Sequence, residues 1–220
     1  MDARHRKNPP LLWLMTDERV DMATLIAAAR RLPKGAAGIV FRHYRTPPPE
    51  RRALFAKLRQ IARRRRLVLL LAGPARQAAA WRADGAHGHD PRRVSRPLLR
   101  SRPVHDEREA LAARHADIAF VSPLFPTRSH PGGRALGPVR FAALARRVEP
   151  MVVALGGVGP RHRHRLRGIG AAGWAAIDGL TRQDQSTRRQ PLAAASRASG
   201  LCGLAANGMS ANSSIGASDT

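Results

Sequence analysis

Residues 120–133, FVSPLFPTRSHPGG, change from an apolar run into a loop of hydroxyl, cationic and glycine residues. Thr127 and Ser129 carry hydroxyl donors, and His130 adds an imidazole that is partly charged at neutral pH. A second stretch, LGGVGP, places the pair Gly156–Gly157 directly before a helix-like segment. Because glycine has no Cβ, its main-chain N–H can approach an anion closely. Together the two stretches predict a phosphate site; a solvated loop and an ordinary glycine turn are the alternatives.

Histidines and acids follow two further apolar runs. The segment HGHD, residues 87–90, holds two imidazoles and the carboxylate of Asp90, a set that resembles a small metal site, with a chance arrangement as the alternative. Mg²⁺ prefers oxygen ligands and often bridges to substrate phosphates, so Asp90 is the candidate metal ligand. His105, followed by DERE, is a candidate general acid or base. The alternative is a polar strand end before a helix with acids in its first turn.

The positive charge of the chain is large and consists mostly of arginine. Lys and Arg number 39 against 15 Asp and Glu, a formal net charge of +24. Such a charge can indicate nucleic-acid binding. However, the arginines are spread along helix-like stretches, and aromatic residues make up only 4% of the chain, so stacking platforms for bases are scarce. The composition favours small phosphorylated partners over nucleic acid, because a basic surface steers anions towards the protein.

Short apolar runs alternate with longer amphipathic ones, and these elements must position the polar residues. The expected strands cover residues 11–16, 38–42, 67–72, 85–89, 102–105, 118–125, 151–157 and 173–178. Apolar strands that alternate with amphipathic helices indicate a parallel sheet covered on both faces. Eight strands predict an α/β fold, a (β/α)8 TIM barrel, with a doubly wound open sheet as the alternative. In such barrels the active site lies at the carboxyl ends of the strands.

The ends of the chain differ from this pattern. We expect residues 1–10 to form an N-terminal extension, residues 11–182 the barrel, and residues 183–220 a low-complexity, mostly disordered tail in which residues 190–198 form part of a last helix. The N-terminus lacks an apolar signal region, and no apolar run approaches the roughly 18 residues of a membrane span. Cys202 is the single cysteine. The expected location is therefore the cytoplasm, away from the membrane.

Several motifs in this order resemble the thiamine-phosphate synthase family. They are LLWLMTDERV, GIVFRHY, ADGAHGHD, PVHDEREALAA, ADIAFVSPLFPTRSHPGG, MVVALGGV and GAAGWAAIDGL, and they cover about residues 11–180. The resemblance implies a TIM barrel that joins hydroxymethylpyrimidine diphosphate to thiazole phosphate. Diphosphate leaves with help from Mg²⁺ and cationic groups, and thiamine phosphate forms.

The resemblance also implies roles for individual positions. Arg42 falls on an arginine that holds diphosphate, and Thr127 and Ser129 fall on hydroxyls that contact thiazole phosphate. Gly157 falls on a glycine whose amide binds the same phosphate, and Asp90 lies near a metal-binding aspartate.

Other positions depart from the family pattern. They are Val40 and Tyr44 beside the arginine, Ala72 and Gly73 where the family has Asn-Asp, Pro103 for a serine, His130 for a lysine, and Asp178 for a serine that contacts phosphate. These losses remove part of the Mg²⁺ and diphosphate site. Two alternatives therefore stay open: an isomerase like the thiazole tautomerase of the same superfamily, with His105 or His130 as proton carrier, and a non-catalytic binder of phosphate ligands or nucleic acid.

Overall fold

The computed structural model describes residues 8–90, 92, 94–128 and 132–181. Eight parallel strands close into a barrel in the order β1 to β8. Their bounds are β1 Leu12–Met15, β2 Ala37–Phe41, β3 Val68–Ala72, β4 Gly85–His87, β5 Leu99–Val104, β6 Ile118–Val121, β7 Met151–Ala154 and β8 Gly173–Ala176. The last strand pairs with the first, at Leu12↔Trp174, so the ring has no free edge. The predicted barrel is confirmed, and the open sheet is wrong.

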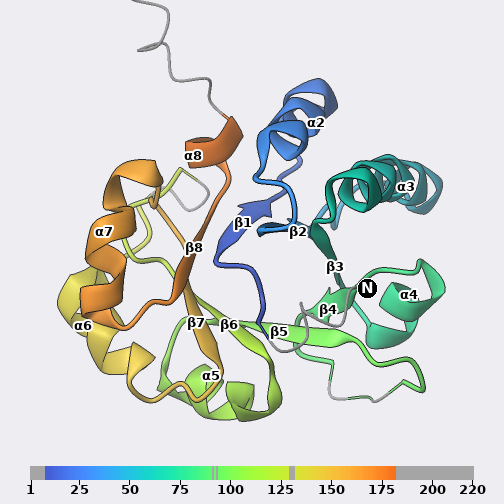
Figure 1. Ribbon diagram of the computed structural model, residues 1–220. Helices are drawn as coiled ribbons and strands as arrows, with labels where there is room; N and C mark the ends of the chain where they lie inside the picture. The colour runs from blue at the N-terminus through green and yellow to red at the C-terminus, as the bar shows by residue number, and fades with distance from the viewer. Residues whose placement is uncertain (1–7, 91, 93, 129–131, 182–220) are drawn as a thin grey trace, which may run out of the picture. The chain divides into compact units, whose positions relative to one another are not determined.

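Helices surround the barrel (Figure 1). Their bounds are α2 Met22–Arg31, α3 Pro48–Arg65, α4 Ala75–Ala80, α5 Glu107–Ala112, α6 Gly137–Ala145, α7 Arg163–Leu166 and α8 Asp178–Thr181. In this view α2, α3 and α4 lie on one side of the strands and α6 and α7 on the other. Within the described residues, no helix combines the length and the apolar character needed to cross a bilayer.

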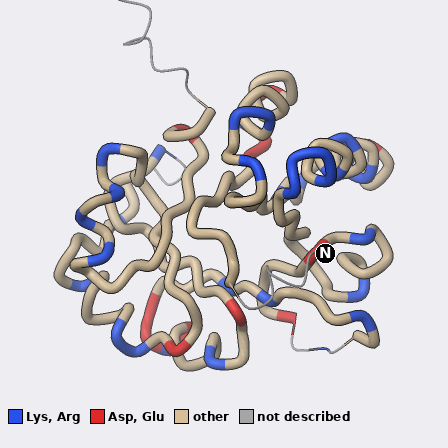
Figure 2. The backbone as a smooth tube through the Cα atoms, viewed as in Figure 1, with Lys and Arg blue, Asp and Glu red and all other residues tan. Residues whose placement is uncertain are grey.

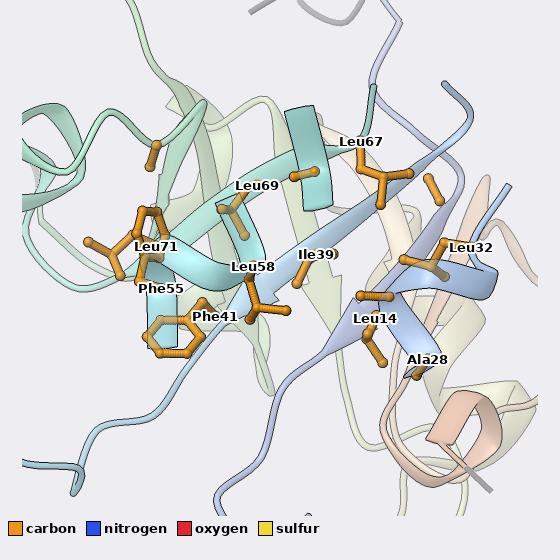
Figure 3. Close-up of a cluster of buried hydrophobic side chains, with 14 of the residues drawn as sticks. Leu14, Ala28, Leu32, Ile39, Phe41, Phe55, Leu58, Leu67, Leu69 and Leu71 are labelled. Atoms are coloured by element: carbon orange, nitrogen blue, oxygen red, sulfur yellow. The ribbon is translucent and has the colours of Figure 1, made fainter. Parts of the chain in front are cut away.

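The core divides into an interior and two outer layers. Trp13, Val40, Leu70 and Phe120 belong to the cluster inside the barrel. Figure 3 shows one outer layer, in which Leu14, Ile39 and Leu69 of the strands pack with Leu58 of α3. A second outer cluster lies under α5, α6 and α7. Because side chains alternate along a strand, neighbouring residues contribute to different layers.

The strand ends differ from the predicted ones in ways that affect the site. The fourth strand ends at His87, because Gly88 has a φ of +138° and breaks the extended backbone. The sequence pattern predicted one strand over residues 85–89. In the structure His87 and His89 do not belong to one strand. The fifth strand begins at Leu99, where it pairs with Gly85, three residues before the predicted start at residue 102. The predicted tail and its helix lie outside the described residues.

Candidate active site at the carboxyl end of the barrel

Arg42 is a partly buried cation of the barrel mouth. Arg42 lies two residues after Val40, whose side chain is in the interior of the barrel. Because side chains alternate along a strand, the side chain of Arg42 also turns inward, just after the end of β2. Its Nε donates to the carbonyl of Thr16 at 3.1 Å and its Nη2 to Asp17 Oδ2 at 3.2 Å. Burial lowers the pKa of Arg42, whereas the charge of Asp17 raises it. The guanidinium remains a fixed positive charge, since arginine stays protonated in proteins.

Asp17 holds this cation and a second one. Arg19 Nε donates to Asp17 Oδ1 at 2.8 Å, and Arg19 Nη2 donates to Oδ2 at 3.1 Å. Burial raises the pKa of Asp17, but the hydrogen bonds and charges of Arg19 and Arg42 outweigh it, so the pKa lies below its ordinary value. The carboxylate is therefore ionised at neutral pH.

Arg19 extends this network of hydrogen bonds across the mouth. The sequence did not predict it as a residue of the site. Its Nη1 donates to the carbonyl of Arg128 at 3.0 Å, so the loop after β1 contacts the loop after β6. The hydrogen bond to Asp17 raises the pKa of Arg19, and the charge of Asp178 adds to this effect. In a chain with so many arginines, the sequence carried no signal that separates this one from the rest.

The glycine pair after β7 packs directly against the loop after β6. Gly156 has a φ of +92° and Gly157 a φ of +64°. A Cβ on Gly157 would lie 2.6 Å from the carbonyl oxygen of Pro126 and 2.7 Å from Phe125 Cβ. Phe125 N also donates to the carbonyl of Gly156 at 3.1 Å. Both the backbone conformation and the close approach therefore require glycine here.

This packing brings two predicted phosphate ligands to one place. Thr127 directly follows Pro126, whose carbonyl approaches Gly157. Within the described part of the chain, the N–H groups of Gly156 and Gly157 donate no hydrogen bond. Such amides at the end of a barrel strand suit an anion. Ser129 and His130, predicted for the same site, lie outside the described residues.

His87 lies on the inner side of the mouth and is neutral. Its side chain is buried, its Nδ1 lies 3.0 Å from Ser101 Oγ, and its ring meets Phe120 edge-on at 5.4 Å between centroids. Burial lowers the pKa of His87 to about 3, and the charge of Arg42 contributes in the same direction. His87 can therefore offer a neutral imidazole to a ligand, but it carries no charge at neutral pH.

This buried imidazole predicts acid sensitivity of the fold. The unfolded chain protonates His87 below its ordinary pKa of 6.5, whereas the folded chain stays neutral down to about 3. Stability is therefore lost as the pH falls below 6.5, by up to about 1.4 kcal/mol per pH unit from this group. Urea unfolding of the wild type and of His87→Asn, near pH 7 and near pH 5, measures it. We expect the variant to lose less stability on acidification; an equal loss in both proteins would contradict the assignment.

Two other histidines lie outside the centre of the mouth. His43, next to Arg42, points to the opposite side of the strand, where it stacks on Phe41 at 4.6 Å between ring centroids. Its Nδ1 lies 3.0 Å from Thr16 Oγ1. His105 lies at the exposed rim, with its Nδ1 2.8 Å from Glu109 Oε2. The predicted acid–base role of His105 remains a prediction, and the contact with Glu109 holds the ring in one orientation.

The surroundings of Asp90 do not fit a magnesium site. Its Oδ2 accepts a hydrogen bond from the N–H of Ala75 at the start of α4, at 2.9 Å, and its Oδ1 accepts from the N–H of Arg92 at 3.0 Å. These bonds lower the pKa of Asp90 and account for both carboxylate oxygens. Gly73 offers no side-chain ligand, and the described residues contain no group of three or more acids, histidines or cysteines that could hold a metal.

The geometry thus places Arg42, His87 and the Gly156–Gly157 turn at the carboxyl end of one barrel, as the order of the motifs predicted. Comparison with known proteins identifies the family. The family model described as thiamine monophosphate synthase matches residues 12–180. The chain belongs to this family. Its sequence therefore places it among proteins of thiamine biosynthesis.

Individual relatives agree with this assignment. A thiamine biosynthesis bifunctional protein, ThiM/ThiE of Symbiobacterium thermophilum, is 30% identical over 190 residues, which are 78% of this chain and 38% of the relative. Another bifunctional protein, ThiED of Geobacter sulfurreducens, is 28% identical over 157 residues, 67% of this chain and 32% of that relative. The chain therefore spans less than two fifths of the length of each of these curated relatives.

A solved structure has the same fold. The thiamine phosphate pyrophosphorylase of Pyrococcus furiosus superimposes with a TM-score of 0.65 and 23% identity, covering 80% of this chain and 90% of the other. At this identity the match supports the barrel and not a particular reaction.

Proposed function

We propose that this protein joins hydroxymethylpyrimidine diphosphate to thiazole phosphate, giving thiamine phosphate and diphosphate. Membership of the thiamine monophosphate synthase family supports the pathway. The observation that carries the reaction is the partly buried cation Arg42 at the same barrel end as the Gly156–Gly157 turn. Such a mouth offers one position for a leaving anion and one for a second phosphate.

In the proposed reaction the C–O bond between the pyrimidine methylene and the diphosphate breaks, and its electron pair leaves with the diphosphate. The thiazole nitrogen donates its lone pair to the methylene cation, which forms the new C–N bond. Arg42, fixed by Asp17 and the Thr16 carbonyl, stabilises the charge that develops on the leaving oxygen. A preorganised cation of this kind acts without rearrangement during the reaction. The Gly157 amide and Thr127 would orient the thiazole phosphate.

A second candidate is a tautomerase-like proton transfer on a thiazole phosphate. The hydrogen bonds of Asp90 favour this candidate. Its carboxylate accepts from two main-chain N–H groups, and such a carboxylate is a poor metal ligand. An isomerase needs the phosphate site and a proton carrier but no diphosphate clamp. His105, paired with Glu109, remains the described candidate for that carrier.

The test uses the purified chain with both substrates, with and without Mg²⁺, and measures thiamine phosphate. We expect product in the wild type and its loss in Arg42→Ala. The matched control is Arg64→Ala, which removes an exposed arginine from the last turn of α3. No product from a protein that still binds thiazole phosphate would overturn the synthase and favour the isomerase. Product at equal rates without Mg²⁺ would show that Arg42 and its neighbours suffice for the leaving group.

A further inference from the structure

The crossover from β4 to β5 differs from the other connections of the barrel. Each other connection between successive strands contains an α-helix, whereas the described residues between His87 and Leu99 contain none. Figure 1 shows this connection as a loop beside α4. In a barrel the outer face of each strand is normally covered by the helix that follows it. The outer face of β4 and β5 therefore lacks the helix that would cover it.

Arginine side chains lie where that helix would pack. Val104 belongs to the outer cluster, so Arg100 and Arg102 alternate with the interior residues and turn outward along β5. Arg100 Nη2 donates to the carbonyl of Asp90, and Arg102 Nη2 donates to the carbonyl of His89 at 3.2 Å. These bonds attach the crossover to β5. The apolar stems of the two arginines are thereby held along the outside of the strand, since arginine buries its stem more readily than its charge.

A groove of about 420 Å³ runs along this face. Its apolar part includes Ala75, Ala86, Leu98 and Ala112, from α4, β4, the crossover and α5. Arg92, Arg96, Arg100 and Arg102 line the same groove, with Asp90 at the end near the mouth. We name it the crossover groove. It combines an apolar stripe with a row of guanidinium groups, which is the complement of an acidic amphipathic helix.

The crossover groove carries more positive than negative charge. Asp90 is the one carboxylate among its described lining residues; main-chain hydrogen bonds lower its pKa, and the charges of Arg92 and Arg100 contribute in the same direction. Among the described residues, no carboxylate forms an ion pair with any of the four arginines. An anionic partner would therefore meet guanidinium groups that hold no ion pair within the described part of the free protein. A second copy of this chain suits the groove poorly, because each copy carries a formal net charge of +24. Figure 2 shows Lys and Arg along α3 and α7 as well.

We propose that the crossover groove binds an acidic amphipathic helix of a partner protein, which lies where the barrel lacks its own helix. The apolar side of the partner helix packs against Ala86 and Leu98, and its carboxylates meet Arg92 and Arg96. Guanidinium groups recognise carboxylates with two parallel hydrogen bonds, so the pairing gives orientation as well as affinity. This inference does not rest on the proposed function, because it uses the outer face of β4 and β5, whereas the proposed chemistry uses Arg42 and the Gly156–Gly157 turn. Gly73 and Asp90 line the groove at its mouth end.

The probe is a fluorescent synthetic peptide of about 14 residues, long enough to form a helix, with Leu at helical spacing and Glu on both flanks of that stripe. A scrambled peptide of equal composition has the same charge but no apolar stripe. Fluorescence anisotropy at physiological ionic strength measures Kd for the wild type and for Arg92→Glu/Arg96→Glu. The matched control is Arg52→Glu/Lys57→Glu, which makes the same change of charge at exposed positions of α3.

We expect the groove variant to weaken binding of the amphipathic peptide by at least about tenfold, and the α3 variant to weaken it less than about threefold. The scrambled peptide should bind the wild type at least about tenfold more weakly. Equal binding of the two peptides, or equal loss in the two variants, would show non-specific attraction to a basic protein and overturn the proposal. Absence of binding would overturn it too. A single-stranded oligonucleotide that binds more tightly than the peptide, and loses binding only in the groove variant, would assign the groove to nucleic acid instead.

Discussion

Replacing Arg42 with alanine is expected to lower kcat/KM for thiamine phosphate formation by about 10²–10³-fold, the usual cost of removing one preorganised donor from a developing anion. Arg42 is partly buried, and its side chain is fixed by Thr16 and Asp17, so its donors are held in place before a substrate binds. Lysine at this position keeps the charge but not the fork of donors, and should recover only part of the rate. Steady-state kinetics on the three proteins measure the effect.

The same variant should fold normally, and this separates a role in catalysis from a role in stability. Asp17 keeps its three hydrogen bonds from Arg19 when Arg42 is removed, so its carboxylate is not left unpaired. We therefore expect a modest change in Tm compared with Arg64→Ala, the exposed control on α3. If Arg42→Ala retained kcat/KM within about threefold of the wild type, the guanidinium would not contact the leaving group.

Gly157→Ala is expected to give the second large effect, by disturbing the phosphate site and the fold together. An alanine at a φ of +64° is strained, and its Cβ would meet the Pro126 carbonyl at 2.6 Å. Strain and overpacking of this kind cost about 1–3 kcal/mol each. The loop that carries Thr127 must move to accept the methyl group. We therefore expect KM for thiazole phosphate to rise by about tenfold or more, and the free energy of unfolding to fall.

Gly35→Ala is the matched control for this substitution. Gly35 has a similar φ of +72°, but a Cβ there would meet nothing within 4 Å. It precedes β2 at the opposite end of that strand from Arg42. Gly35→Ala therefore introduces a similar backbone strain, but its Cβ collides with no atom and lies away from the phosphate site. If both variants lost equal stability and left KM unchanged, the close packing of Gly157 against the loop after β6 would have no functional role.

The sequence by itself determined the barrel and the end of it that carries the polar residues. Continuous apolar runs such as residues 67–72 alternate with amphipathic stretches, and this local periodicity predicted every strand. It also predicted that Arg42 and the Gly156–Gly157 turn follow strands and so meet at one end of the sheet. Both conclusions rest on short-range patterns. Neighbouring residues alone determine how side chains alternate along a strand and which residues follow its carboxyl end.

Only the tertiary structure decided which of these groups act together. Arg19 and Arg128 are 109 residues apart, and the closure of the ring brings their loops into contact. Asp90, predicted as a metal ligand, instead caps α4 through Ala75. Neither pairing follows from residue type alone. A carboxylate can bind a cation, a main-chain N–H or a metal, and the sequence does not show which partner it has. The choice depends on the register of strands and on where each loop returns, which long-range packing sets.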